Sequence, residues 1–360
     1  MKRRDFLRST GTLCAGLALS KSIPLFAGQS APWREFEVTT RVEVLKPSGP
    51  TRIWLPAALV ENTPFQRTHS NTFHAEGGKA KLIQDKLDAL GVISAIYPEH
   101  ARPVLTLISR VSLKDYAVDL AAPGRPVYVS GANLQYFLRP TKFVPTDGIV
   151  KETAIKATKG ATTDVEKARA IYDWIVDNTF RDPKVLGCGR GDIRFMLESG
   201  DLGGKCADLN ALYVGMARSV GLPARHVYGL RLAKSEFGYK SLGIPSATAT
   251  KSQHCRAEVF LENHGWVPVD PADVRKVVLE EPPGHLKLND APVTKARTRL
   301  FGSWEMNWMA YNYGQDISLP GSSRDPLIFF MYPQAETAEG RLDPLDPDHF
   351  RYEITVKELS

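Results

Sequence analysis

One cysteine of this sequence stands where a reactive thiol is expected. Cys206 follows the run Gly203-Gly204-Lys205 and opens a stretch in which apolar residues recur at helical spacing. A thiol at the amino end of a helix lies at the positive end of the helix dipole, which lowers its pKa and favours the nucleophilic thiolate. Lys205 adds a positive charge, and the glycines allow a sharp turn and the approach of a substrate. The alternative is a buried structural cysteine, the common fate of a free thiol.

A thiolate nucleophile needs a base and a group that orients the base. His254 begins a strand pattern, a turn follows, and a returning strand pattern ends at Asp270. Because a hairpin brings its outer ends together, we expect Asp270 to accept from one nitrogen of His254 while the other nitrogen faces Cys206. Each residue also has a plainer interpretation, His254 as an ordinary polar residue and Asp270 as the start of a turn. Asp273 is a nearby alternative to Asp270.

Two helices and three strands are expected to position these residues. Thr163 and Glu166 form the capping box of a first amphipathic helix over 164–178. A second helix begins at Cys206 and ends before Gly221, which occupies the position where helices commonly end in glycine. Strand patterns then follow at 225–232, 255–261 and 266–269. The order of helices followed by strands predicts an α+β fold.

The residues before the first helix have a different period. Apolar side chains alternate over 34–58, and further strand patterns follow. These further patterns lie at 72–75, 91–97 and 104–111. We therefore expect a β-rich N-terminal domain at 33–140.

Segments near the carboxyl end are also expected to form strands. Residues 299–319 are expected to complete the core sheet, and 327–332 and 350–356 read as final strands. Four aromatic residues of this region either line a substrate cleft or belong to the core, and we favour the core. They are Trp304, Trp308, Tyr311 and Tyr313.

Three segments together resemble the transglutaminase-like superfamily. The first is Gly204-Lys205-Cys206-Ala207-Asp208, continued by Gly221-Leu222-Pro223-Ala224-Arg225. The second is His254 with its strand, and the third is Gly265-Trp266-Val267-Pro268-Val269-Asp270-Pro271. The order Cys, His, Asp and the gaps of 48 and 16 residues also match the family. The likeness covers roughly 150–275.

The resemblance implies a papain-like transglutaminase core, in which the helix that bears the cysteine packs on an antiparallel sheet, preceded by a β-sandwich-like domain. It implies Cys206 as nucleophile, His254 as general base and Asp270 as the residue that orients the base. It places this catalytic domain at 150–320 and leaves 321–360 as final strands that pack on the rest.

The chemistry implied is attack on an amide carbonyl and formation of an acyl-thioester. Water would release the acyl group in a peptidase or amidase, and an amine would release it in a transglutaminase; family likeness favours hydrolysis. Peptides or proteins, cell-wall peptides among them, are the expected substrates. The alternative is a non-catalytic peptide- or cell-wall-binding module with the same fold, although all three catalytic positions are filled. The donor side chain that would stabilise the oxyanion is not identified by spacing, and the glycine-rich segment 181–204 shapes or covers the cleft.

The first thirty residues read as an export signal. Arg3 and Arg4 precede Phe-Leu, a weakly apolar stretch spans 10–20, and small residues follow at 27–31. The arginine pair resembles a twin-arginine signal, which implies export to a bacterial periplasm. We expect residues 1–30 to be removed, with no membrane anchor after cleavage.

Composition limits the remaining classes of function. Without residues 1–27 the chain holds 41 basic and 39 acidic residues, which does not suggest nucleic-acid binding. The sequence has no nucleotide or flavin motif, so no cofactor is expected. It has no Cys-x-x-Cys pair, and adjacent His254 and Cys255 on a strand point to opposite faces, so no metal site is expected. Cys188 and Cys255 either form a disulfide or remain thiols.

Overall fold

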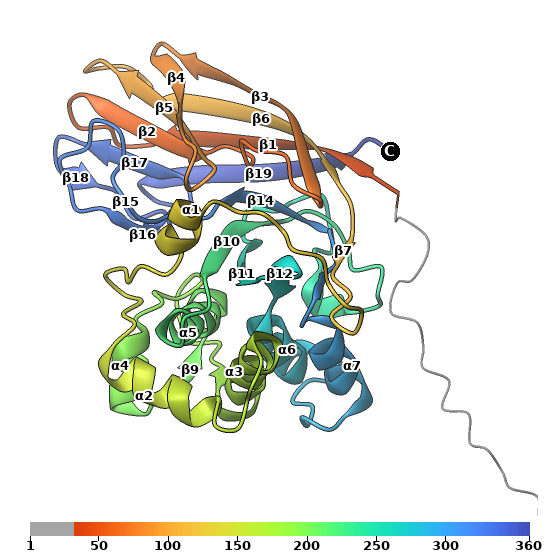
Figure 1. The fold of residues 1–360 in the computed structure, drawn as a ribbon. Helices are drawn as coiled ribbons and strands as arrows, with labels where there is room; N and C mark the ends of the chain where they lie inside the picture. The colour runs from red at the N-terminus through yellow and green to blue at the C-terminus, as the bar shows by residue number, and fades with distance from the viewer. Residues whose placement is uncertain (1–31) are drawn as a thin grey trace, which may run out of the picture. The chain divides into compact units, whose positions relative to one another are not determined.

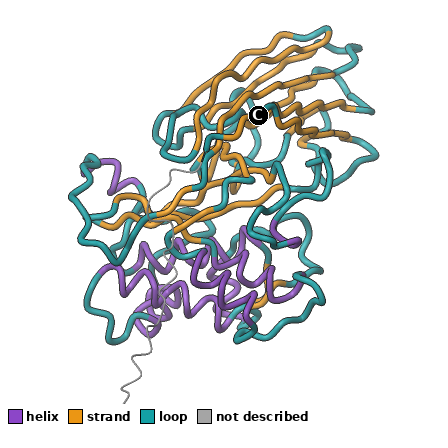
Figure 2. The backbone as a smooth tube through the Cα atoms, turned by 90° about the vertical axis from the view of Figure 1, so that its right-hand side faces the viewer, coloured by secondary structure: helices purple, strands orange, loops and turns teal. Residues whose placement is uncertain are grey.

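The computed structural model describes residues 32–360, so the expected export signal lies outside the described residues. Figure 1 shows the elements in chain order, and Figure 2 shows that strands and helices occupy separate layers. No helix of the described residues is long and apolar enough to cross a membrane. The predicted α+β class is confirmed.

Two antiparallel sheets form a sandwich. One has the strand order β19-β1-β6-β3 and the other has the order β18-β17-β2-β5-β4. Apolar side chains of both sheets share one core cluster, which includes Val42, Ile53 and Phe350. The strands of the first sheet are β1 (Arg34–Val44), β3 (Gln66–Glu76), β6 (Val104–Leu113) and β19 (Phe350–Glu358). Those of the second are β2 (Thr51–Pro56), β4 (Lys79–Asp85), β5 (Leu90–Tyr97), β17 (Gln334–Thr337) and β18 (Gly340–Arg341).

The sandwich is built from both ends of the described chain. β19 pairs along its whole length with β1, and β17 pairs with β2. Alternation explains why β1 is a strand with one buried face, because Phe36, Val38 and Val42 are buried while the residues between them are less so. The final strands therefore close sheets that the first strands begin.

A third antiparallel sheet, of order β12-β11-β10-β14, lies between the sandwich and the helices (Figure 1). Its strands are β10 (Ala224–Arg231), β11 (Gln253–Leu261), β12 (Gly265–Val269) and β14 (Trp308–Asn312). The structure confirms the predicted hairpin of β11 and β12. It also confirms that a strand of the 299–319 region completes this sheet.

Helix α5 (Cys206–Ser219) packs on this sheet and is buried along almost all of its length. Helix α3 (Asp164–Asn178) packs beside it and starts with the predicted capping box of Thr163 and Glu166. The other helices are α1 (Gly131–Tyr136), α2 (Gly148–Ala157), α4 (Ile193–Ser199), α6 (Pro271–Glu280), α7 (Ala291–Arg299) and the short 3₁₀ helix η1 (Lys240–Leu242). Three two-stranded pairs complete the described chain: β7 (Tyr116–Ala117) with β13 (Ser303–Trp304), β8 (Phe180–Arg181) with β9 (Gly203–Gly204), and β15 (Gln315–Ile317) with β16 (Leu327–Phe329).

Candidate active site

Cys206 is the first residue of α5 and lines a cavity of about 560 Å³. Its side chain is nearly buried, so the cavity is the route by which a substrate would reach the sulfur. In the described part of the chain, no acceptor is hydrogen-bonded to the backbone N–H of Cys206. That N–H is therefore available as an oxyanion donor at the positive end of a helix.

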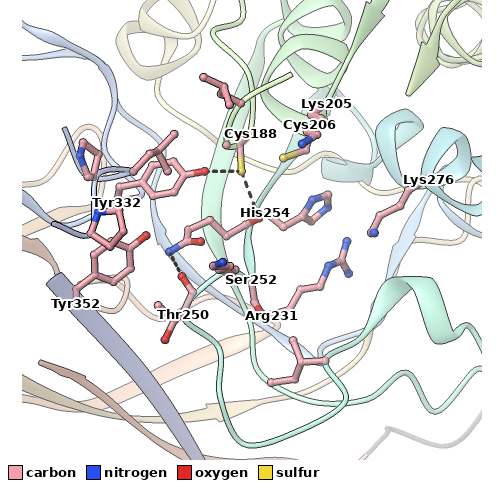
Figure 3. A pocket seen from close by; sticks show the side chains of 18 of the residues that line it. Cys188, Lys205, Cys206, Arg231, Thr250, Ser252, His254, Lys276, Tyr332 and Tyr352 are labelled. Atoms are coloured by element: carbon pink, nitrogen blue, oxygen red, sulfur yellow. Dashed lines mark hydrogen bonds between the residues drawn. The ribbon is translucent and has the colours of Figure 1, made fainter. Parts of the chain in front are cut away.

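His254 lies on β11 and also lines this cavity. Its Nε2 lies 2.8 Å from Oδ2 of Asp270, and since a carboxylate only accepts, Nε2–H is the donor. Nδ1 is then the nitrogen left for the thiol of Cys206, and Figure 3 shows the ring of His254 beside Cys206. The structure therefore brings the three predicted residues together.

Asp270 is held in place by both of the elements that it joins. It follows β12 directly and is the N-cap of α6, where its Oδ1 accepts from the backbone N–H of Asp273. The buried amide of Asn210 on α5 donates to the same oxygen. One oxygen of Asp270 thus fixes the carboxylate, and the other is free to orient His254.

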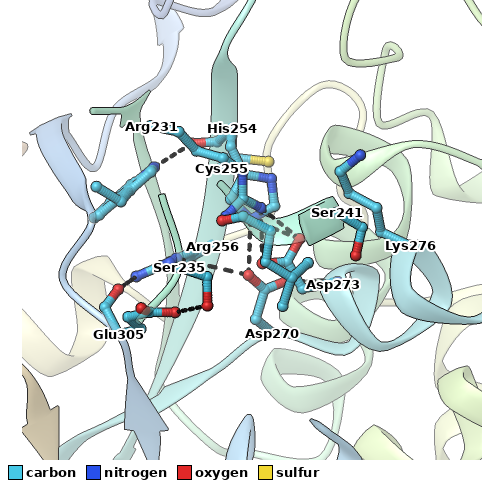
Figure 4. A network of polar contacts seen from close by, with 12 residues as sticks. Arg231, Ser235, Ser241, His254, Cys255, Arg256, Asp270, Asp273, Lys276 and Glu305 are labelled. Carbon is cyan, nitrogen blue, oxygen red and sulfur yellow. Dashed lines mark hydrogen bonds and ion pairs between the residues drawn. The ribbon is translucent and has the colours of Figure 1, made fainter. Parts of the chain in front are cut away.

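Asp273, the alternative orienting residue, has a different partner. Both of its oxygens accept from Nη2 of Arg231, at 2.6 and 2.7 Å. It lies 3.4 Å from Nε2 of His254, farther than Asp270 does. Asp273 therefore adds negative charge near the imidazole, while Asp270 makes the shorter bond (Figure 4).

These contacts shift the two titrations in opposite directions. Hydrogen bonds from the thiols of Cys188 and Cys255, together with His254, lower the pKa of Cys206 well below its ordinary value against the effect of burial. Burial and Arg231 act to lower the pKa of His254, but Asp273 and Asp270 outweigh them and raise it. Both shifts act in favour of the ion pair of a thiolate and an imidazolium.

The two neighbouring thiols stay protonated. The hydrogen bond to Cys206 and burial raise the pKa of Cys188 well above its ordinary value. Burial first, and then Cys206, raise the pKa of Cys255 in the same way. Negative charge is thus concentrated on one sulfur. Cys188, Cys206 and Cys255 are free thiols in the structure. Cys188 and Cys255, for which a disulfide or two thiols were possible, are therefore thiols here.

The glycine-rich segment places Cys188 against the start of α5. The carbonyl oxygen of Cys188 accepts from the backbone N–H of Ala207 at 2.9 Å. Asp208 accepts from the backbone N–H groups of Arg190 and Gly191 and, with its other oxygen, from that of Lys205. One buried carboxylate therefore ties the segment to the amino end of α5.

Gly189 makes this close approach possible. Its φ is +91°, and a Cβ at this position would lie 1.8 Å from Oδ2 of Asp208. A side chain is excluded both by backbone conformation and by space. The glycine-rich segment therefore shapes the cleft, which was one of the two expectations for it.

Sequence reasoning missed two side chains of the cleft wall. Tyr332 lies beyond β16 and its hydroxyl donates to Sγ of Cys188 at 3.1 Å. Arg231, at the end of β10, carries no motif. The sequence around these two residues gives no sign of their place in the cleft. The one local sign of this wall is the run of glycines around Cys188, because glycines there indicate a close approach of the backbone.

His254, Asp270 and Asp273 also present a nitrogen and two oxygens within 4.8 Å of one another, the spacing of a metal site. The geometry argues against a metal ion there. Buried Arg231 occupies both oxygens of Asp273, and Nε of buried Arg256 lies 3.7 Å from Asp270. A divalent cation would have to displace or repel these two charges, so the cluster fits a charge network.

The four aromatic residues of the 304–313 region are all buried. None of them lines the cavity at Cys206, so the core interpretation is confirmed. Trp308 has an indirect link to the site, because its indole N–H donates to the backbone oxygen of His254 at 2.8 Å. It helps to fix the strand that carries the histidine.

Comparison with known proteins places this arrangement in a family. Residues 151–271 match the model of the transglutaminase-like superfamily. An uncharacterized protein of Haemophilus influenzae is 34% identical over 364 residues, which cover 96% of this chain and 97% of that protein. The chain belongs to the transglutaminase-like superfamily. Both proteins are thus members of one family along nearly their whole lengths.

A solved structure supports the fold. The crystal structure of a candidate cysteine protease from Cytophaga hutchinsonii superposes with a TM-score of 0.52 at 16% identity, over 91% of this chain and 99% of that chain. At this identity the likeness concerns the fold alone. The papain-like transglutaminase fold predicted for the chain is thereby confirmed.

Proposed function

We propose that this transglutaminase-like protein is a cysteine peptidase or amidase that cleaves peptide or isopeptide bonds. The observation that carries the proposal is the alignment of Cys206, His254 and Asp270 at the cavity, with Nε2 of His254 2.8 Å from Asp270. The opposite shifts in the pKa of Cys206 and of His254 support it, because they favour a charged nucleophile and a protonated acid in one site.

The geometry gives each residue a step in the reaction. The thiolate of Cys206 attacks the amide carbonyl, and its own backbone N–H stabilises the oxyanion. The imidazolium of His254 gives its proton to the leaving amine, and an acyl-thioester remains. Neutral His254 then takes a proton from the attacking water, and the acid product leaves. Asp270 keeps the imidazole in the required tautomer and orientation throughout.

The reactive thiol is tested by intact-protein mass spectrometry with a neutral electrophile such as iodoacetamide. A single adduct is expected, absent in Cys206→Ala and slowed in His254→Ala, which removes the partner of the thiolate. Equal and slow labelling of the three thiols in wild type, with the same rates in His254→Ala, would contradict catalysis. It would leave the alternative, a non-catalytic binding module.

Hydrolysis and acyl transfer are separated by the mass of the product. A library of peptides, cell-wall stem peptides included, is incubated with the protein in the presence and absence of a primary amine. Hydrolysis adds one water to the acyl fragment, whereas transfer adds the amine. We expect the water product to predominate even with the amine present.

The proposed place of action is the bacterial periplasm. The support is the leader pattern at the amino end of the sequence, with Arg3 and Arg4 before Phe6 and Leu7. Replacing both arginines by lysine keeps the charge but removes the pair, and it is expected to block export. Cell fractionation checks this result, and unchanged export of the double variant would contradict a twin-arginine route.

A further inference from the structure

The wall of the cavity at Cys206 is strongly positive. Among the described residues that line it, six are lysine or arginine and none is aspartate or glutamate. The six are Arg181, Lys205, Arg231, Lys251, Lys276 and Arg351. The body of the chain is close to neutral, so this concentration of one sign is local to the cavity.

Three of these cations are neutralised in part by carboxylates outside the lining. Arg231 is buried, and its Nη2 donates to both oxygens of Asp273. Arg181 and Lys276 both pair with Glu280, so two positive charges share one carboxylate there. This part of the wall keeps a net positive charge.

The other three cations have no carboxylate partner in residues 32–360. Lys205 is half-buried directly before Cys206, whereas Lys251 and Arg351 are exposed. They come from three different segments, namely the turn before α5, the approach to β11 and the start of β19. The free charges therefore reach the cavity from three separate segments of the chain.

Acidic side chains do occur in the loop 343–348, which contributes part of the wall. None of the three lines the cavity, and two of them are turned toward their own loop. Asp343 accepts from the backbone N–H of Leu345, and Asp346 accepts from that of Asp348 and pairs with His349. Three residues of this loop line the cavity, and all three are apolar: Pro344, Leu345 and Pro347. The loop thus leaves the positive charge of the cavity uncompensated.

We infer that the cavity selects an acidic peptide, one whose residues beside the scissile amide carry carboxylates. Unpaired lysine and arginine side chains bind carboxylates by charge-assisted hydrogen bonds. A cleft lined by one sign of charge also raises the local concentration of the opposite sign. This inference rests on the proposed function, because it concerns the substrate of the same nucleophile.

Two small reagents test the charge preference without a known substrate. Iodoacetate and iodoacetamide alkylate the same sulfur and have nearly the same shape, but only iodoacetate is anionic. The measured quantity is the alkylation rate of Cys206 by iodoacetate divided by its alkylation rate by iodoacetamide. Wild type is compared with Lys251→Gln, Arg351→Gln and the double variant. Lys151→Gln is the matched control, since Lys151 is an exposed residue of α2 that does not line the cavity.

The ratio is expected to fall about twofold for each charge removed, because an exposed unit charge near the sulfur acts through a water-like dielectric. The fall should shrink as salt is added, because salt screens exposed charges. Lys151→Gln should keep the wild-type ratio. A ratio that is equal in wild type and the double variant would overturn the inference.

Matched peptides extend the test to turnover. A peptide with glutamate beside the scissile bond is expected to have a higher kcat/KM than its glutamine counterpart, and the double variant should reduce this preference. Equal kcat/KM for both peptides would overturn the acidic preference alone. If Cys206 reacts with neither reagent faster than Cys188 does, the proposed function itself fails.

Discussion

His254 faces two carboxylates that differ in what else they bind: Nε2 lies 2.8 Å from Asp270 and 3.4 Å from Asp273. The other oxygen of Asp270 accepts from the backbone of α6 and from Asn210, which are neutral donors. Asp273 gives both oxygens to Arg231. The first carboxylate is therefore placed to orient the imidazole, and the second to set the local charge.

This division of roles predicts different results for two isosteric variants. Asp270→Asn should lower kcat by about 10² to 10⁴, because an amide can donate to Nε2 and thereby favour the wrong tautomer. Asp273→Asn should lower kcat less. Steady-state kinetics on the same peptide, with unfolding curves for both variants, check the comparison. Equal losses of kcat in two equally stable variants would contradict the assignment of Asp270 as the orienting residue.

Asp273→Asn should also move the alkaline side of the pH profile. The active state pairs a thiolate with an imidazolium, so activity is lost as pH rises through the pKa of His254. Asp273 raises that pKa, and its removal should lower it, so the alkaline limb of kcat/KM shifts to lower pH. The acid limb serves as the internal control. An alkaline limb that stays in place would contradict the charge role of Asp273.

Cys188 should control the acid limb of the pH profile. Its thiol makes the leading contribution to the lowered pKa of Cys206. In Cys188→Ala the pKa of Cys206 should rise, so the acid limb of the alkylation rate moves to higher pH. Measuring the rate of iodoacetamide labelling from pH 4 to pH 10 checks this. An unchanged acid limb would show that Cys188 does not stabilise the thiolate.

The core of the site could be predicted because its residues lie on regular elements. Cys206 starts a helix with clear apolar periodicity, and His254 and Asp270 flank a hairpin whose register follows from its turn. Cys188 and Tyr332 could not be placed on the site in this way, since the contact between them joins residues 144 positions apart. Such contacts depend on tertiary packing, which local patterns do not encode.

Prediction of the fold from local sequence patterns meets the same limit. Strands with strict alternation, such as β1, were predicted, whereas β4 was missed because its sequence KAKLIQD is polar and mostly exposed. Pairing of β19 with β1 joins strands from the two ends of the described chain. Their apolar patterns indicated strands, but not which strands would be neighbours.

Gly189 offers a test of the link between the glycine-rich segment and reactivity. In Gly189→Ala the new methyl group would collide with the carboxylate of Asp208, so the segment and Cys188 must move. We expect the rate of Cys206 alkylation to fall about tenfold or more, with a loss of stability. Gly160→Ala is the matched control, because Gly160 has a φ of +90° and no atom within 4 Å of its added Cβ.

Both glycine variants carry the backbone cost of a side chain at positive φ, about 1 kcal/mol. They differ in the collision with Asp208, so the comparison isolates that contact. Gly160→Ala should keep the wild-type alkylation rate. If both variants react like wild type, the position of Cys188 does not depend on this close approach.

A buried histidine outside the site should make the fold sensitive to acid. His226 on β10 stacks on Tyr228, and burial together with Arg218 lowers its pKa to about 3. Since an unfolded histidine titrates near 6.5, its contribution to stability is complete above that pH and is lost as the pH falls toward 3. At pH 4.5 the loss is about 2 to 3 kcal/mol.

His226→Phe keeps the planar ring but removes the titration, so it isolates this effect. Urea unfolding of wild type and variant at pH 7 and pH 4.5 gives four values of the unfolding free energy. The carboxylates that also titrate in this range are common to both proteins and cancel in the comparison. Wild type should therefore lose about 2 to 3 kcal/mol more than His226→Phe between the two pH values. Equal losses would mean that His226 is not held neutral by the fold.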